Sequence, residues 1–470
     1  MGTPSVYPMG TIIYKPEKCF NGFTLFQANE RGAVIIDMNG TTMNCWEGLH
    51  GFPNKLLPEG QIMGSRGQRD TKFSDQDMKD LVQVDWDGNI IWEWKQKEFI
   101  TDPGFEGEWM ARQHHDYQRE GNPVGYYTPE LEPKTTSGNT LILIHEDVKD
   151  SKISLHELED DSIIEVDWNG NIVWEWRCHE HFDEFGFNNI QKNALARDPG
   201  LCSNGKGDWM HINSMSLLGP NKWYEAGDQR FHPDNIIISG RQTNIVAIIE
   251  KKSGKIVWQL GPNYSEGAAK EIGQIIGQHH AHMIPKGLPG EGNILIFDNG
   301  GFAGYTAPNE STETGKNGIV RSYSRVLEID PTAMKIVWQC RPMDLGYLQP
   351  MTSDHFFSCY ISSAQRLPNG NTLIAEGEDG RLIEITPEYE IVWEYICPYF
   401  GEKFNTNMVY RAYRYPYNYI PQLKQPKEVA IEPIDNIDYR LPGAKGKEFR
   451  RLVRVEGVEN YREVNSFCLQ

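Results

Sequence analysis

The chain has 470 residues and carries 46 Lys and Arg against 65 Asp and Glu, which gives a net charge of −19. A chain this acidic repels polyanions, so we expect neither nucleic acid nor an anionic membrane as a partner. An anionic substrate would need a locally positive pocket. The sequence has no apolar run of about 18 residues, and its first residues lack the basic and apolar segments of a signal peptide. We therefore expect a cytoplasmic protein, or a periplasmic or secreted one if the chain is a processed form.

A hairpin-like unit that ends in tryptophan occurs six times along the chain. Each unit is an alternating apolar strand, a turn that often contains DG, NG or SG, and a second strand of β-branched residues and Trp. The units are VIIDMNGTTMNCWEG, LVQVDWDGNIIWEW, IIEVDWNGNIVWEW, VAIIEKKSGKIVWQL, VLEIDPTAMKIVWQC and LIEITPEYEIVWEY. Their terminal tryptophans are Trp46, Trp92, Trp174, Trp258, Trp338 and Trp393. We expect these side chains to pack between sheets and to take no part in chemistry.

A second, shorter element precedes several of these units, and it consists of a Gly/Asn turn followed by a short apolar strand. It occurs at 21–29, 137–147, 233–242, 291–300 and 369–378. Together the pieces indicate about four strands per repeat, and such sheets close into a ring because one sheet cannot bury both of its faces alone. We therefore predict an all-β fold, a six-bladed β-propeller with long inter-strand insertions. The propeller is expected to span residues 1–400, with 401–470 as an irregular C-terminal extension packed on it.

Polar residues recur just upstream of the second element in successive repeats. They come from RQHHDYQ, DWMHINSMS and GQHHAHM, and IIISGRQ adds an arginine at a strand end. The candidates are His114, His115, His211, Asn213, Arg241, His279, His280 and His282. Equivalent positions of different blades converge around one axis, so we expect these side chains to gather there. A guanidinium fork and an amide suit an anion, and a neutral imidazole can attack that anion or exchange protons with it.

The remaining histidines divide into two groups. His145 follows an apolar strand, so whether it faces the channel is left open. The others lie in loops or polar segments and are expected to be structural: His50, His156, His179, His181, His232 and His355.

The ordered set of these segments resembles the bacterial arylsulfate sulfotransferases, the family that works without the nucleotide sulfate donor. The resemblance covers roughly residues 10–417 and rests on GTIIYKPEKCFNGFTLF, QHHD, DWMHINSMS, IIISGRQTNIVAIIEKKSGKIVWQLG, QHHAHM, GNILIFDNG, SAQRLPNGNTLIAEG and NMVYRAYRYP. It implies a six-bladed propeller and a ping-pong transfer of a sulfuryl group from an aryl sulfate to a phenol. The implied partners are these two small molecules, and no cofactor is expected. Whether the chain forms a homo-oligomer is left open by the sequence.

The resemblance also implies roles for single residues. His279 would be the nucleophile that is transiently sulfated, and His115, or with less support His114, would lie near the transferring group. The pair His211 and Asn213, together with Arg241, would hold sulfate oxygens and assist proton transfer. His280 and His282 are additional histidines in the nucleophile's motif, and we expect them to contact the substrate.

Three other functions remain open from the sequence. The central histidines could hold a metal ion for hydrolysis, lyase chemistry or oxidation. A quinone-cofactor dehydrogenase shares tryptophan repeats of this kind, but this chain has only six of them and no adjacent cysteines. A protein-binding scaffold would explain the propeller but not the gathered His, Asn and Arg residues.

Overall fold

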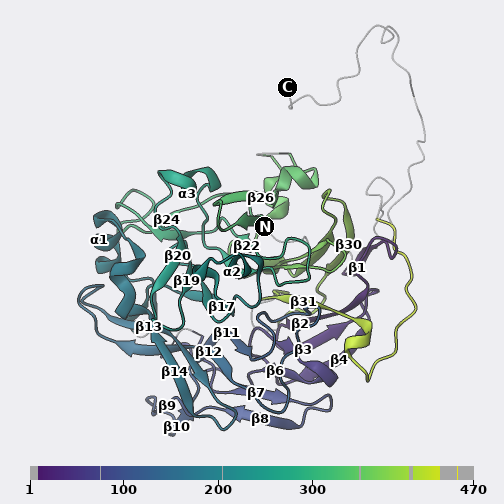
Figure 1. Cartoon of the computed structure of the whole chain (residues 1–470), viewed down its shortest axis with the longest axis horizontal. Coiled ribbons are helices and arrows are strands. Elements are labelled where there is room, and N and C mark those ends of the chain that lie inside the picture. The colour runs from purple at the N-terminus through teal and green to yellow at the C-terminus, as the bar shows by residue number, and fades with distance from the viewer. Residues whose placement is uncertain are drawn as a thin grey trace. The chain divides into compact units, whose positions relative to one another are not determined.

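Six small sheets ring an axis in the compact unit Met1–Ile431, as Figure 1 shows. The computed structural model describes residues 9–74, 76–203, 205–348, 351–401, 406–433 and 453. Strands dominate these residues and helices are few, so the predicted all-β, six-bladed propeller is confirmed. The unit Glu432–Gln470 lies almost entirely outside the described residues.

Each blade contains four antiparallel strands, ordered below from the innermost strand outward. The first three blades are β31 (Ala412–Pro416), β2 (Gly22–Ala28), β3 (Gly32–Ile36) and β4 (Thr42–Glu47); β5 (Lys55–Leu56), β6 (Ile62–Gly64), β7 (Leu81–Val84) and β8 (Ile90–Trp94); and β11 (Gln113–Arg119), β12 (Thr140–Val148), β13 (Glu157–Val166) and β14 (Ile172–Arg177). The last three are β17 (Ile212–Leu217), β18 (Ile236–Gly240), β19 (Ile245–Ile249) and β20 (Ile256–Leu260); β21 (His279–Met283), β22 (Ile294–Asp298), β25 (Arg325–Asp330) and β26 (Lys335–Cys340); and β27 (Ser363–Arg366), β28 (Thr372–Glu376), β29 (Arg381–Ile385) and β30 (Ile391–Ile396). The six tryptophan units form the two outer strands of each blade.

Both ends of this unit close the ring. β31 pairs with β2 and completes the first blade, while β1 (Gly10–Tyr14) pairs with β30 on the outer edge of the last blade. The sequence places residues 412–416 within an irregular extension, and the structure differs on this point. In AYRYP an aromatic side chain occupies every second position, and all residues but the last are buried against the first blade. The placement of the remaining extension up to residue 470 stays a prediction.

The six repeat tryptophans join each blade to the next through their indole N–H groups. Trp46 donates to Asp85 O, Trp92 to Trp168 O, Trp174 to Lys251 O, Trp258 to Pro331 O, Trp338 to Pro387 O and Trp393 to Met38 O, over 2.7 to 3.3 Å. Four of the rings are buried as expected, but Trp174 and Trp338 are only half-buried. In the third blade, Trp176 is the more buried tryptophan, at 3% exposure. These side chains therefore link adjacent blades through hydrogen bonds and also pack in the hydrophobic core.

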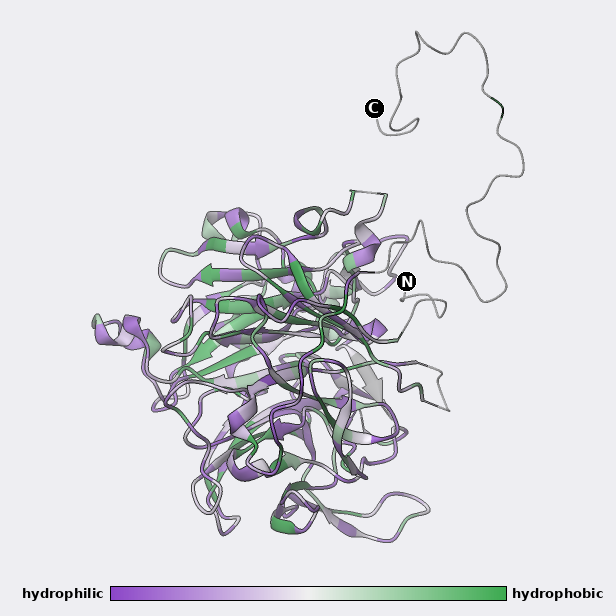
Figure 2. Cartoon of the chain, turned by 90° about the vertical axis from the view of Figure 1, so that its right-hand side faces the viewer, coloured by the Kyte–Doolittle hydropathy of each residue, from purple (hydrophilic) through white to green (hydrophobic). Residues whose placement is uncertain are grey.

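The insertions carry the irregular structure. They contain α1 (Asn189–Arg197), α2 (Lys222–Glu225), α3 (Gly267–Ile272), β9 (Glu98–Ile100), β10 (Glu108–Met110), β15 (Leu201–Ser203), β16 (Lys206–Asp208), β23 (Ala303–Tyr305) and β24 (Lys316–Ile319), and short 3-10 turns lie at 58–60, 178–185, 229–231, 342–345, 353–356, 377–379 and 417–419. Figure 2 shows apolar residues concentrated on many of the blade strands. Within the described part of the chain, no helix has the length and apolar character needed to cross a membrane.

Three innermost strands carry a register irregularity, and a histidine in or next to each of them adopts a positive φ. The register shifts within β11, β17 and β21, and His115, His211 and His280 adopt φ values of 49°, 52° and 52°. A non-glycine residue at positive φ costs about 1–3 kcal/mol, and a bulge redirects the neighbouring side chains. The fold therefore places strained backbone where polar side chains meet the axis.

Candidate active site

A cavity of about 350 Å³ opens between the blades, and four of the predicted site residues line it. These are His115 from β11, His211 just before β17, Arg241 just after β18 and His279 at the start of β21. The other lining side chains are mostly apolar or aromatic. They include Phe52, Phe302, Tyr360, Ile361, Met408 and Tyr410, together with the amides Gln27, Asn29, Gln76 and Asn317.

His279 is buried and held in one orientation. Its Nδ1 lies 2.8 Å from Asn299 Oδ1 and 3.0 Å from Gly277 O, so Nδ1 is the protonated nitrogen. Its Nε2 accepts a hydrogen bond from the Ile361 N–H at 3.1 Å. Burial first and then the Arg241 charge hold the pKa of His279 well below its usual value. At neutral pH the ring is therefore uncharged, with its lone pair on Nε2.

His211 and Arg241 stand together because their backbones are bonded to each other. The Arg241 N–H donates to His211 O at 3.0 Å. The ring Nδ1 of His211 lies 2.5 Å from Asp208 Oδ2, and its backbone N–H donates to Asp208 Oδ1 at 3.1 Å. Although burial opposes ionisation, the contacts with His211 lower the pKa of Asp208. The carboxylate therefore fixes the His211 ring and stabilises a proton on its Nδ1.

His115 lies on the aromatic side of the cavity. Its ring is 4.6 Å from that of His211, 5.9 Å from Phe52 and 6.0 Å from Tyr410, measured between centroids. Phe52 and Tyr410 are themselves 4.5 Å apart. Burial, and then the neighbouring His211, keep the pKa of His115 well below its usual value. The site thus has a cationic side near His279 and an aromatic side near His115.

Four residues predicted to bind substrate do not line this cavity. His114 points behind His115, and its Nδ1 lies 2.8 Å from His115 Nδ1. Asn213 uses its Nδ2 to donate to Gln278 O at 2.7 Å, which ties the strand after His211 to the residue before His279. His280 and His282 lie beside a smaller chamber. Adjacent residues of a strand face opposite sides, so a single motif cannot send every histidine to one cavity.

The smaller chamber lies around a buried ion-pair network. Asp116 contacts Lys55 at 2.6 Å and Arg411 at 2.9 Å, and both His280 and His282 line the same space. Tyr126 Oη lies 2.8 Å from His282 Nε2, and His282 Nδ1 lies 2.9 Å from His280 O. Burial lowers the pKa of His282 to about 4. The His282 imidazole therefore serves hydrogen bonding inside the ring, and both histidines lie away from the larger cavity.

Two groups of side chains are close enough together to be considered as metal ligands. His114, His145 and Asp161 form one, and Asp77, His145 and Glu159 form the other. The rings of His114 and His145 stack 3.6 Å apart at 10°, so their lone pairs run parallel and do not converge on one ion. Asp77 and Glu159 are paired with the buried Arg112. Both groups fit hydrogen-bonded and ion-paired clusters better than a metal centre.

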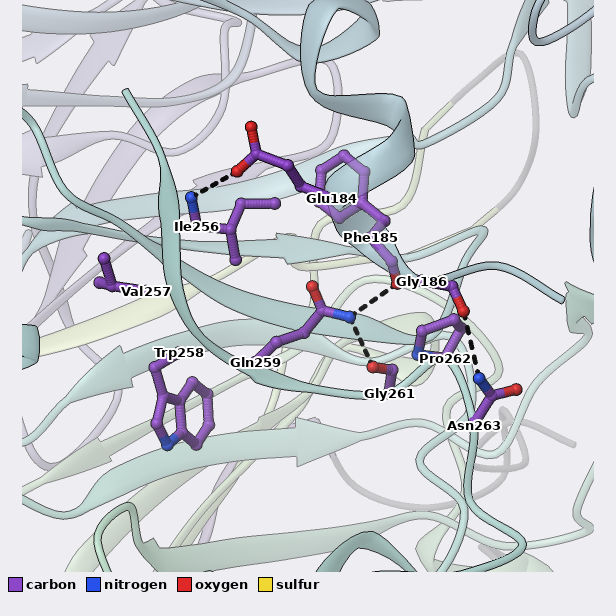
Figure 3. A pocket seen from close by; sticks show the side chains of 10 residues that line it. All are labelled: Glu184, Phe185, Gly186, Ile256, Val257, Trp258, Gln259, Gly261, Pro262 and Asn263. Carbon is purple, nitrogen blue, oxygen red and sulfur yellow. Dashed lines mark hydrogen bonds between the residues drawn. The ribbon is translucent and has the colours of Figure 1, made fainter. Parts of the chain in front are cut away.

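A second hollow lies at the surface, between the 3-10 turn 178–185 and β20. Figure 3 shows that its polar groups bond to one another. Gln259 Nε2 donates to Phe185 O and Gly261 O, and the Ile256 N–H donates to Glu184. No histidine or arginine is among the described residues that line it. It therefore offers no evident chemistry.

Sequence reasoning missed three groups that orient the site: Asn299, Asp208 and the Ile361 amide. Asp208 stands three residues before His211 within DWMHINSMS, and Asn299 ends the strand segment GNILIFDNG, so both lie inside recognisable motifs. Ile361 carries no such signal. It adopts φ 54°, which is a genuine outlier for a β-branched residue, and Ser362 follows at φ 90°. Only the folded chain reveals that this turn reaches His279.

The architecture and the site define a propeller with a cavity lined by three histidines and an arginine. The family model for arylsulfotransferase (ASST) matches residues 133–392, more than half of the chain. The chain belongs to the arylsulfotransferase family, and this membership indicates aryl sulfotransferase activity.

Solved structures with similar folds share little sequence with the chain. A Bacteroides caccae protein of unknown function is 13% identical, with 84% of this chain and 98% of that one covered and a TM-score of 0.43. The Pseudomonas aeruginosa periplasmic gluconolactonase PpgL is 9% identical, with 83% and 98% covered and a TM-score of 0.39. The β-propeller domain of Myceliophteria thermophila Cps50 (Swd1) is 9% identical, with 84% and 91% covered and a TM-score of 0.38. No curated protein matches the chain.

Proposed function

We propose that the protein moves a sulfuryl group from an aryl sulfate to a phenolic acceptor through a sulfohistidine at His279. The observation that carries this proposal is the neutral, oriented His279 beside Arg241 in a cavity with an aromatic wall. A nucleophile needs its lone pair free of a proton, and the pKa of His279 is lowered by burial and by Arg241. The proposed reaction needs no resident cofactor.

In the first half-reaction, His279 Nε2 attacks sulfur and the bond between sulfur and the aryl oxygen breaks. The Nδ1 proton stays on the ring, where Asn299 Oδ1 and Gly277 O accept from it and stabilise the positive charge that the ring acquires. The Ile361 N–H, now on Nε2, would turn to a sulfuryl oxygen once the nitrogen–sulfur bond forms. The acceptor phenol then attacks the same sulfur and restores His279.

Arg241 and His211 are proposed to hold the sulfuryl oxygens. Arg241 is the charge that acts most strongly on His279, and the His211 ring, held by Asp208, lines the same cavity. Preorganised cationic donors stabilise the charge that develops during transfer, and removing one donor typically costs about 10²–10³-fold in rate. His115, beside Phe52 and Tyr410, is proposed to exchange the proton of the aryl oxygen.

A chromogenic aryl sulfate incubated with phenol tests the proposal. Without an acceptor, we expect the wild type to release the coloured phenolate for a single turnover only. With phenol present, release should continue over many turnovers. His279→Ala should lose roughly 10³-fold or more of this activity, since it removes the nucleophile. His156→Ala, an exposed loop histidine, serves as the matched control and should retain it. No release by the wild type, or undiminished release by His279→Ala, would contradict the proposal.

A further inference from the structure

We infer that His114 and Asp161 form a proton relay behind His115, which supplies the proton to the leaving aryl oxygen and recovers it from the acceptor phenol. The relay rests on the sulfuryl transfer proposed above, and it assigns catalytic support to residues outside the cavity. His114 and Asp161 would act through His115, so they are positioning and proton-storing residues.

The first link joins two imidazoles. His114 Nδ1 and His115 Nδ1 are 2.8 Å apart, and both rings are buried. Two neutral rings can make this contact only if one nitrogen carries the proton and the other offers its lone pair. The protonation of His114 therefore decides whether the remaining nitrogen of His115, Nε2, presents an N–H or a lone pair to the cavity.

The second link joins His114 to a carboxyl group. His114 Nε2 lies 3.3 Å from Asp161 Oδ1 without the geometry of a hydrogen bond, and neither atom has a hydrogen-bond partner among the described residues. The second oxygen, Oδ2, accepts from the Ile212 N–H at 3.0 Å, which anchors the carboxyl group. A small rotation of either side chain closes the link. Two fully buried polar atoms left facing each other are costly unless they share a proton.

The surrounding charges indicate where that proton resides. Burial first, and then Asp208 and Asp160, raise the pKa of Asp161 well above its usual value, against the opposing effects of His145 and the Ile212 N–H. His145 stacks on His114, and burial together with the charge of His145 holds the pKa of His114 well below its usual value. The imidazolium form of His114 is thus disfavoured, while the Asp161 carboxyl group can hold a proton.

The relay balances the two half-reactions. With Asp161 protonated, its O–H donates to His114 Nε2, His114 Nδ1–H donates to His115 Nδ1, and His115 Nε2–H faces the cavity. When the aryl oxygen leaves sulfur it takes the His115 Nε2 proton, each ring passes one proton forward, and Asp161 becomes a carboxylate. The products are a phenol, a sulfohistidine with its Nδ1 proton retained, and ionised Asp161. The acceptor phenol reverses each proton step as it attacks sulfur.

Asp161→Asn provides a direct test because it keeps the shape and both contacts. The amide oxygen can accept from the Ile212 N–H and the amide N–H₂ can donate to His114 Nε2, but the amide cannot release a proton. We expect kcat/KM to fall by roughly 10²-fold for an aryl sulfate whose phenol has an ordinary pKa of about 10. With a donor whose electron-poor phenolate leaves without a proton, we expect less than about a threefold change.

Asp80→Asn is the matched control. Asp80 is a buried carboxyl group of the second blade, and its oxygens accept from the Arg66 backbone N–H and side chain at 2.8 Å each, away from His114 and Asp161. Any loss in this variant should be the same for both donors. Equal losses for both donors in Asp161→Asn, no loss for either, or the same selectivity in Asp80→Asn would overturn the relay. A wild type inactive on the electron-poor donor would instead overturn the proposed function itself.

Discussion

Replacing Asp208 by Asn should disable His211 while leaving the propeller folded. Asp208 uses one oxygen for the His211 ring, at 2.5 Å, and the other for the His211 backbone N–H, at 3.1 Å. An amide cannot accept at both positions. If the amide N–H₂ faces the backbone, it meets the His211 backbone N–H, and two donors then face each other. If it faces the ring, it donates to Nδ1 of His211, and the ring proton must move from Nδ1 to Nε2. Either arrangement removes a hydrogen bond to a charged group, which contributes about 1.5–3 kcal/mol.

This loss corresponds to a decrease in kcat of roughly 10- to 150-fold, because about 1.36 kcal/mol is a tenfold change in rate. The assay is steady-state transfer from a chromogenic aryl sulfate to phenol, with circular dichroism to verify folding. Asp80→Asn is the matched control, since Asp80 accepts from the backbone N–H and the side chain of Arg66 in the same manner, at 2.8 Å each, on another blade. A folded Asp208→Asn protein with the kcat of the wild type would refute the reasoning.

Three further predictions concern the ring, the aryl wall and pH. Trp393→Phe should lower the denaturant midpoint of unfolding more than Trp338→Phe. Trp393 is fully buried and donates to Met38 O at 2.7 Å, whereas Trp338 is half-buried and donates to Pro387 O at 3.3 Å. Equal shifts would contradict the role of the tryptophans in joining the blades. Phe52→Ala should raise KM for aryl sulfates roughly 10- to 150-fold, because it removes an apolar contact worth about 1.5–3 kcal/mol of binding free energy. An unchanged KM would show that Phe52 does not contact the aryl group. Burial alone would lower the pKa of His145, but Glu159, Asp77 and Asp208 raise it to about 10. The stability that this charge contributes is complete below the unfolded histidine pKa of about 6.5 and is lost as pH rises towards about 10. The unfolding free energy of the wild type should therefore exceed that of His145→Gln most at low pH, and the difference should shrink over this range. A constant difference from pH 6 to pH 10 would contradict this prediction.

The fold could be predicted because the sequence repeats its own pattern. Six alternating units ending in tryptophan required six sheets, and the ring followed from their need for partners on both faces. The innermost strand of the first blade was missed, since AYRYP has no turn or tryptophan signal and pairs with β2, which lies near the opposite end of the chain. A pairing this distant depends on ring closure, which only the assembled blades determine.

The site was predictable in part for the same reason. Equivalent positions in successive repeats brought His115, His211, Arg241 and His279 to one cavity. The register irregularities in β11 and β21 decide which of two adjacent histidines faces it, and no pattern in QHH distinguishes them. The groups that set protonation, Asp208, Asp161 and Asn299, reach the histidines through local folding and neighbouring strands, so their roles follow from distances rather than from motifs.

The most direct test of sulfuryl transfer through His279 is a single pulse of aryl sulfate without acceptor, followed by alkaline quench and peptide mass analysis. We predict one added sulfuryl group on the peptide that contains His279, and its loss when phenol is added before the quench. A sulfuryl group on another residue, or none on the enzyme while phenolate is released, would contradict the proposed mechanism.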